Sequence, residues 1–158
     1  MHFLLKSYAG IVFLGNKFQT VLLLLLRLYW GPAFFISGLG KFGNISNVID
    51  FFASLNIPYP AFSAYLTAGI ECVGGLCLLF GLLSRLAAIP LVVITLSAML
   101  TDNISEVKNV LNDPQNLISQ LPFSFFLVAL IIFSFGPGKW SLDYLFKKRF
   151  CTKNKPSN

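Results

Sequence analysis

The sequence is poor in charged residues and in histidine. Only 11% of its 158 residues are charged, and His2 is its single histidine. A soluble domain of this size has about 25% charged residues. With 56% hydrophobic residues, the chain has too few polar side chains to cover an apolar core against water. A lipid bilayer solvates apolar surface directly, so the composition predicts an integral membrane protein.

Cysteine is also scarce, and its spacing argues against one class of redox enzyme. The chain has three cysteines, Cys72, Cys77 and Cys151, and no CxxC motif. Cys72 and Cys77 are five residues apart, which places them about 140° apart around a helix. A thiol–disulfide membrane enzyme needs closely paired cysteines, so we expect these residues to serve in helix packing. Because histidine ligands and cofactor fingerprints are also missing, no metal site is predicted.

The net charge of +6 does not indicate a nucleic-acid-binding surface. Six of the twelve basic residues follow Gly138: Lys139, Lys147, Lys148, Arg149, Lys153 and Lys155. A basic tail after hydrophobic segments is typical of a membrane topology signal. We therefore expect the lipid bilayer, and no nucleic acid, among the partners of the protein.

Four hydrophobic runs are long enough to cross a bilayer as helices. They cover residues 20–40, 61–83, 85–101 and 117–136. A short amphipathic segment within 42–60 is expected to lie in the membrane interface. The predicted fold is all-α, an integral membrane four-helix bundle with a short interfacial helix between the first and second spans. Its parts are an N-terminal interfacial or frayed segment (1–19), the transmembrane domain (20–140) and a basic cytoplasmic tail (141–158).

The distribution of charge predicts the orientation of the bundle. Basic residues occur near the N-terminus, at Arg85 between the second and third spans, and in the tail. The loop 102–116 instead has three acidic residues and one lysine. By the positive-inside rule, both termini and Arg85 lie in the cytoplasm. The protein is thus predicted to be a multi-pass protein of the inner or plasma membrane.

Arg27 belongs to a polar stripe on the first span. At 100° per residue, Gly31, Gly38 and Lys41 all fall within about 40° of Arg27. Pro32 lies in the same helix and is expected to bend it. Glycines allow two helix backbones to approach, so this stripe is predicted to face another helix.

Glu71 is an acid in the middle of the otherwise apolar second span. Gly75 lies about 40° and Gly74 about 60° from it around the helix, so Glu71 should face the bundle interior. If Thr20 and Arg85 mark the cytoplasmic ends, Glu71 lies opposite Phe34, and Arg27 and Lys41 are each about 10 Å away along the membrane normal. An unpartnered charge at the bilayer centre costs about 2.5–3.5 kcal/mol, so a partner is expected.

Three states of Glu71 remain open at this point. It can pair with Arg27, accept a hydrogen bond from Lys41, or stay protonated in a dry pocket. A Glu71–Arg27 pair that only fixes the bundle is an alternative to a ligand site. Lys41 by itself fits a lysine that snorkels to the headgroups, and Arg85 fits a topology anchor.

The order of these motifs resembles the DoxX family of small bacterial membrane proteins. The first part of the shared pattern is Arg27-Leu28, Gly31, Phe34, Gly38 and Lys41-Phe42. The second is "E..GG..LL.GL..R.AA", which begins at Glu71, and the third is "GPGKWSLD", 136–143. The likeness covers about residues 20–145. It implies a four-helix membrane bundle with cytoplasmic termini. In this family some members are a subunit of a thiosulfate:quinone oxidoreductase, and others associate with thiol-handling or oxidative-stress partners.

Two functions follow as hypotheses. In the first, the chain is a membrane subunit of a redox system with an interior pocket for a quinone headgroup or small anion, and Glu71 is its catalytic, proton-transferring residue. The ligand-binding residues are then Arg27, Lys41, Gly31, Gly38, Gly74 and Gly75. In the second, the chain is a non-catalytic membrane partner or assembly factor whose polar residues only specify packing.

A small-solute transporter is a third hypothesis, although a single four-helix unit would have to oligomerise to transport. Quinone is the candidate cofactor, and a protein partner or a homo-oligomer is expected. Whether the chain itself catalyses a reaction stays open.

Overall fold

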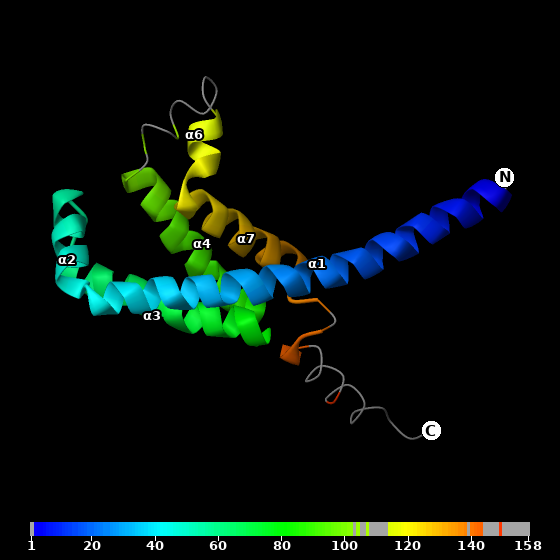
Figure 1. Cartoon of the computed structure of the whole chain (residues 1–158), viewed down its shortest axis with the longest axis horizontal. Coiled ribbons are helices and arrows are strands. Elements are labelled where there is room, and N and C mark those ends of the chain that lie inside the picture. Colours follow the sequence, from blue (N-terminus) through cyan, green and yellow to red (C-terminus); the bar gives the residue numbers. More distant parts are fainter. Residues whose placement is uncertain are drawn as a thin grey trace.

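The computed structural model is all-helical in the part of the chain that it describes (Figure 1). That part comprises residues 2–102, 104, 107, 114–138, 140–143 and 149. Within it, side chains are described from residue 12 onward, except that of residue 114. The helices are α1 (His2–Gly43), α2 (Ile45–Ser54), α3 (Pro60–Phe80), α4 (Ser84–Thr101), α6 (Pro114–Ser119) and α7 (Leu121–Phe135). The predicted all-α membrane bundle with a short helix after the first span is confirmed. Most of the predicted tail lies outside the described residues.

Helix α1 is much longer than the predicted first span. Its 42 residues extend over about 63 Å, roughly twice the thickness of the bilayer hydrocarbon. From His2 onward the predicted N-terminal segment is the first part of this helix, because no proline interrupts the chain before Pro32. Figure 1 shows that this part of α1 extends beyond the other helices.

Helices α1 and α3 lie antiparallel and in close contact. A Cβ atom added to Gly75 would lie 2.6 Å from the backbone nitrogen of Phe35 and 2.7 Å from the carbonyl oxygen of Gly31. A Cβ on Gly38 would lie 2.8 Å from the carbonyl oxygen of Ala68. The contacting atoms belong to the backbone, so these glycines allow the two helices to approach, as in other membrane helix pairs.

The last predicted span is divided into two helices. Gln120, between α6 and α7, has ψ 132°, which is extended rather than helical. Pro122 explains the break, because a proline ring clashes with the carbonyl four residues earlier but fits the first turn of a new helix. The resulting α7 has 15 residues and a length of about 22 Å, shorter than a full crossing.

The helices form two pairs, α1 with α3 and α4 with α7, and α3 also contacts α4. In Figure 1 the α4–α7 pair is inclined to the α1–α3 pair, and α2 lies transverse to α1 at one end. The buried core at the junction of the pairs consists of Phe34, Leu78, Leu91, Val128, Ala129 and Ile132. We call the end that holds residues 81–85 and 136–143 the Arg85 end, and the opposite one the α2 end.

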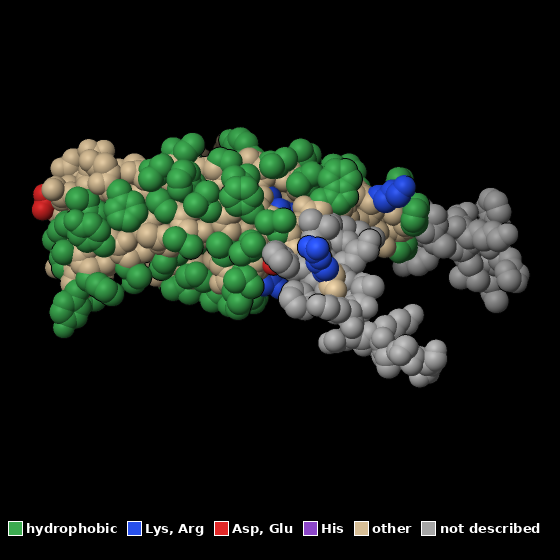
Figure 2. Space-filling model, turned by 90° about the horizontal axis from the view of Figure 1, so that it is seen from below, with side chains coloured by type: hydrophobic (Ala, Val, Ile, Leu, Met, Phe, Trp, Pro, Cys, Tyr) green, Lys and Arg blue, Asp and Glu red, His purple; other side chains and the backbone are tan. Residues whose placement is uncertain are grey.

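The surface matches a membrane environment. Figure 2 shows hydrophobic side chains along the length of the molecule and only a few charged groups on this face. Among the described residues, three helical segments are long and apolar enough to cross a membrane: Val12–Gly43, Pro60–Phe80 and Ser84–Thr101. Large apolar side chains on them are exposed, including Ile36 at 66% and Val73 at 64%. Lipid contact accounts for this exposure.

Candidate functional site

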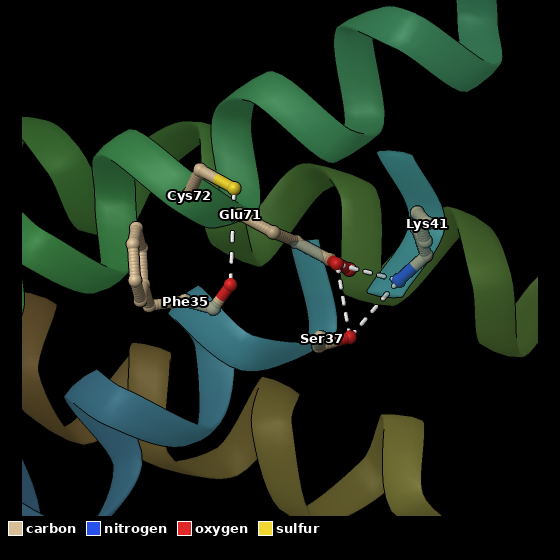
Figure 3. A network of polar contacts seen from close by, with 5 residues as sticks. All are labelled: Phe35, Ser37, Lys41, Glu71 and Cys72. Carbon is tan, nitrogen blue, oxygen red and sulfur yellow. Dashed lines mark hydrogen bonds and ion pairs between the residues drawn. The ribbon is translucent and has the colours of Figure 1, made fainter. Parts of the chain in front are cut away.

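Lys41 and Glu71 form an ion pair between α1 and α3 (Figure 3). The Lys41 Nζ atom donates to Glu71 Oε2 at 2.5 Å. The Ser37 hydroxyl donates to the same oxygen at 3.0 Å, and Lys41 Nζ also donates to Ser37 Oγ at 3.1 Å. The three side chains therefore form a closed triangle of hydrogen bonds. Of the three states that the sequence left open for Glu71, the structure has the one with Lys41.

Local sequence explains how these side chains meet. Ser37 and Lys41 are four residues apart on α1, so they lie one above the other on the same face. Gly38 on α1 packs against Cys72 on α3, a neighbour of Glu71, and would not tolerate a Cβ there. The close approach of the backbones at this point brings the Glu71 carboxylate within reach of α1. The cluster thus depends on the glycine contact beside it.

The burial of the pair is uneven. The Glu71 side chain is 10% exposed and the Lys41 side chain is 27% exposed. The opposite charges compensate each other, which removes much of the cost of an isolated charge in a membrane segment. Together with Ser37, the pair offers an ammonium and a hydroxyl as hydrogen-bond donors and a carboxylate as acceptor. Such a set can hold a carbonyl oxygen and exchange protons with it.

Arg27 lies elsewhere, at the Arg85 end. Its Nε donates to the carbonyl of Leu78 at 2.8 Å, and its Nη2 donates to that of Leu79 at 3.1 Å. Its Nη1 donates to the carbonyls of Pro137 at 2.7 Å and Trp140 at 3.1 Å. Only 2% of Arg27 is exposed. The guanidinium therefore joins the last turn of α3 to the segment that follows α7.

The offset between α1 and α3 separates Arg27 from Glu71. Gly31 of α1 contacts Leu79 of α3, and Gly38 of α1 contacts Cys72 of α3. Because the helices are antiparallel, a residue of α1 and a residue of α3 lie at the same level when their numbers sum to about 110. Glu71 is thus opposite residue 39 rather than Phe34, a difference of about 7.5 Å along the helix. Lys41 is then about 3 Å and Arg27 about 18 Å from the level of Glu71. The sequence estimate failed because it placed Thr20 at the depth of Arg85, whereas α1 continues past that depth.

The four glycines of the predicted pocket lie at helix contacts. Gly31, Gly38 and Gly75 lie where α1 meets α3, and a Cβ on Gly74 would be 2.8 Å from the Leu91 side chain of α4. The predicted site residues are therefore distributed over three places. Lys41 and Glu71 are brought together, Arg27 is in a separate cluster, and the glycines position the helices.

Sequence reasoning missed two residues with clear roles. Ser37 completes the triangle, and its position four residues before Lys41 was a usable signal. Asp143 accepts hydrogen bonds from the backbone nitrogens of Leu83 at 2.7 Å and Ser84 at 3.1 Å, and so caps α4. Although 141–158 was assigned to the tail, Ser141 and Asp143 pack against the bundle. About sixty residues separate Asp143 from the helix that it caps, so no local pattern could reveal it.

The fold and the ion pair define a helical membrane protein with a polar cluster inside its apolar spans. The chain belongs to the DoxX family, whose model matches residues 22–103. It is 37% identical to the "Putative oxidoreductase CatD" of Bacillus subtilis over 86 residues, which are 54% of this chain and 63% of that relative. It is 29% identical to the "Inner membrane protein YqjF" of Escherichia coli over 137 residues, 85% of this chain and 99% of that protein.

Two further comparisons extend this result. An uncharacterized protein of Haemophilus influenzae is 30% identical over 142 residues, which cover 85% of this chain and 89% of that protein. No solved structure matches the chain. The resemblance inferred from the motifs is therefore confirmed at the level of the family.

Proposed function

We propose that the chain is the membrane-embedded subunit of a redox system and that Lys41 and Glu71 bind the headgroup of a quinone. The observation that carries the proposal is the ion pair itself, because a partly exposed ammonium next to a carboxylate is rare within membrane-spanning helices. The name of the Bacillus subtilis relative, "Putative oxidoreductase CatD", supports a redox role. A small anion is the alternative ligand of the same ammonium.

The chemistry assigned to each residue follows from its donors and acceptors. Reduction of a quinone to a quinol takes up two electrons and two protons. Lys41 would donate a hydrogen bond to a quinone oxygen, and Glu71 would take protons from water and pass them to the quinone oxygens. The electrons would come from a redox group of a protein partner. Arg27 is assigned no part in this step because its hydrogen bonds go to four backbone carbonyls.

The test is quinone binding to the purified protein in detergent. Quinones quench tryptophan fluorescence, and the chain has two tryptophans. We expect Glu71→Gln and Lys41→Met to weaken binding of a short-chain quinone at least about tenfold, the loss of a charge-assisted hydrogen bond. Asp50→Asn is the matched control, because Asp50 is an exposed acid on α2. Equal quinone affinity in Glu71→Gln and Asp50→Asn would refute the site.

A second candidate is a non-catalytic membrane partner, in which the pair only joins α1 to α3. It is favoured by one specific observation: both charges come from helices that already pack tightly through glycine. Under this alternative, Lys41→Met destabilises the fold by leaving a carboxylate unpaired, and the double variant with Glu71→Leu restores it fully. Under the first proposal the double variant regains stability but still lacks quinone binding and quinone-dependent activity.

We also propose that both termini and the Arg85 end face the cytoplasm, as the positive-inside rule requires. Alkaline phosphatase is active only after export. A phosphatase fusion within residues 102–116 should therefore be active, and one at the C-terminus inactive. The reverse pattern would invert the proposed orientation.

A further inference from the structure

A cavity of about 480 Å³ with both polar and apolar lining residues lies at the Arg85 end, away from the Lys41–Glu71 pair. One wall is α1 with Asn16, Gln19 and Thr20, and the opposite wall is the Gly136–Pro137–Gly138 segment with Arg85. Its size falls within the range of about 300–1,000 Å³ that ligand sites occupy. The cavity exists because α1 continues beyond the ends of α3 and α7 and thereby provides a wall that those helices lack.

The cavity contains hydrogen-bond donors that the fold does not use fully. Arg85 is exposed, and it donates to the Ser134 carbonyl at 3.4 Å, a long and weak hydrogen bond. Within the described part of the chain, the side-chain amides of Asn16 and Gln19 have no hydrogen-bond partner. Arginine carries five N–H donors in a planar fork, so most of the Arg85 fork is available to a ligand.

The one acid in the wall is already engaged. Both carboxylate oxygens of Asp143 accept backbone N–H groups at the start of α4. The carbonyl of Pro137 in the same wall accepts from Arg27. These two acceptors therefore already have partners within the fold, and Arg85 is the charged donor of the cavity lining that is left for a ligand.

The depth of the cavity identifies the source of the ligand. Helix α3 ends at Phe80, α4 begins at Ser84 and α7 ends at Phe135, so the cavity lies where these helices leave the apolar region. Phe135 is 60% exposed, next to the cavity that it lines, and Leu83 is 56% exposed beside Ser84. These apolar side chains lie on the same end of the molecule as the donors. A phosphate with acyl chains attached fits both features.

We propose that this cavity binds the phosphate of an anionic phospholipid headgroup, with Arg85 as its main ligand and Asn16 and Gln19 as further donors. The planar fork of arginine matches the oxygens of a phosphate in a way that a lysine cannot. Basic sites between membrane helices are typical binding places for anionic lipid headgroups. The acyl chains extend along Phe135 toward the bilayer.

The test uses the full-length protein, delipidated in a neutral detergent, and measures its melting temperature on addition of dioleoyl phosphatidylglycerol. Dioleoylglycerol is the lipid control, because it has the same chains and lacks the phosphate. We expect phosphatidylglycerol to raise the melting temperature and dioleoylglycerol to have no such effect. Arg85→Gln should lower phosphatidylglycerol affinity about tenfold or more, since a charge-assisted contact is lost.

Lys17→Gln is the matched protein control. Lys17 is an exposed cation at the same end, but its Nζ lies over the Phe13 ring at 5.0 Å and it does not line the cavity. Its substitution should leave the lipid effect intact. Gln19→Leu provides a second, uncharged test of the cavity wall and should reduce the effect as well.

Two outcomes would overturn the proposal. If Arg85→Gln and Lys17→Gln respond equally to phosphatidylglycerol, the lipid acts on general surface charge and the cavity is not its site. If inorganic phosphate or glycerol 3-phosphate stabilises the wild-type protein as much as phosphatidylglycerol does, the ligand is a soluble phosphate and the lipid assignment is wrong.

Discussion

Replacement of Arg27 by methionine is expected to destabilise the protein strongly. Methionine fills much of the same space but removes all four hydrogen bonds to the carbonyls of Leu78, Leu79, Pro137 and Trp140. The side chain is 2% exposed, so water cannot replace the lost donor without rearrangement. The segment after α7 would then lose one of its main attachments to α3.

The size of the effect can be bracketed from the hydrogen bonds. Hydrogen bonds inside membrane proteins average about 0.6 kcal/mol each, which gives about 2.5 kcal/mol for four as a lower bound. Bonds to a charged group contribute about 1.5 kcal/mol or more, which gives about 6 kcal/mol. At roughly 2–4 °C per kcal/mol for a protein of this size, the melting temperature should fall by at least about 5 °C.

Thermal unfolding in lipid-free detergent provides the assay, and Arg85→Met is the matched control. Arg85 is exposed and has a single long contact, at 3.4 Å, to a carbonyl, so its replacement should cost under about 0.5 kcal/mol. Arg27→Lys should lie between the two, because one ammonium cannot reach carbonyls on two separate segments as a planar fork does. Equal losses in Arg27→Met and Arg85→Met would refute the role assigned to Arg27.

Two further predictions concern helix packing and capping. Gly75→Ala should destabilise the fold and loosen the α1–α3 contact, because its Cβ would lie 2.6 and 2.7 Å from backbone atoms of α1. Gly40→Ala is the control: its Cβ would have no neighbouring atom within 4 Å, so the substitution should be neutral or slightly stabilising. Thermal unfolding of both variants checks this, and similar behaviour would contradict it. Asp143→Ala removes the cap of α4 and should cost about 0.5–2 kcal/mol. Faster amide hydrogen exchange confined to the first turn of α4 is its expected signature, and unchanged exchange there would exclude the cap.

The sequence predicted much of the fold because the relevant signals are local. The lengths of the apolar runs predicted the membrane helices, and the run that begins at residue 61 predicted the start of α3 to within one residue. The break at Gln120 was missed although its cause, Pro122, is also local. The length of α1 was underestimated because the apolar run of the first span was taken to begin at residue 20 and residues 1–19 were treated as a separate segment, whereas the helix continues through both.

For the candidate site, the amino-acid pattern alone predicted that Glu71 faces another helix and needs a polar partner, since helical periodicity and the cost of a buried charge are properties of one segment. The packing of the helices shows that the partner is Lys41 and that Arg27 instead donates to backbone carbonyls more than fifty residues away. These contacts depend on the axial offset of α1 against α3. A helix can slide along its neighbour without any change in its own periodicity, so the side-chain contacts between the two helices, and not either sequence alone, fix which charges meet.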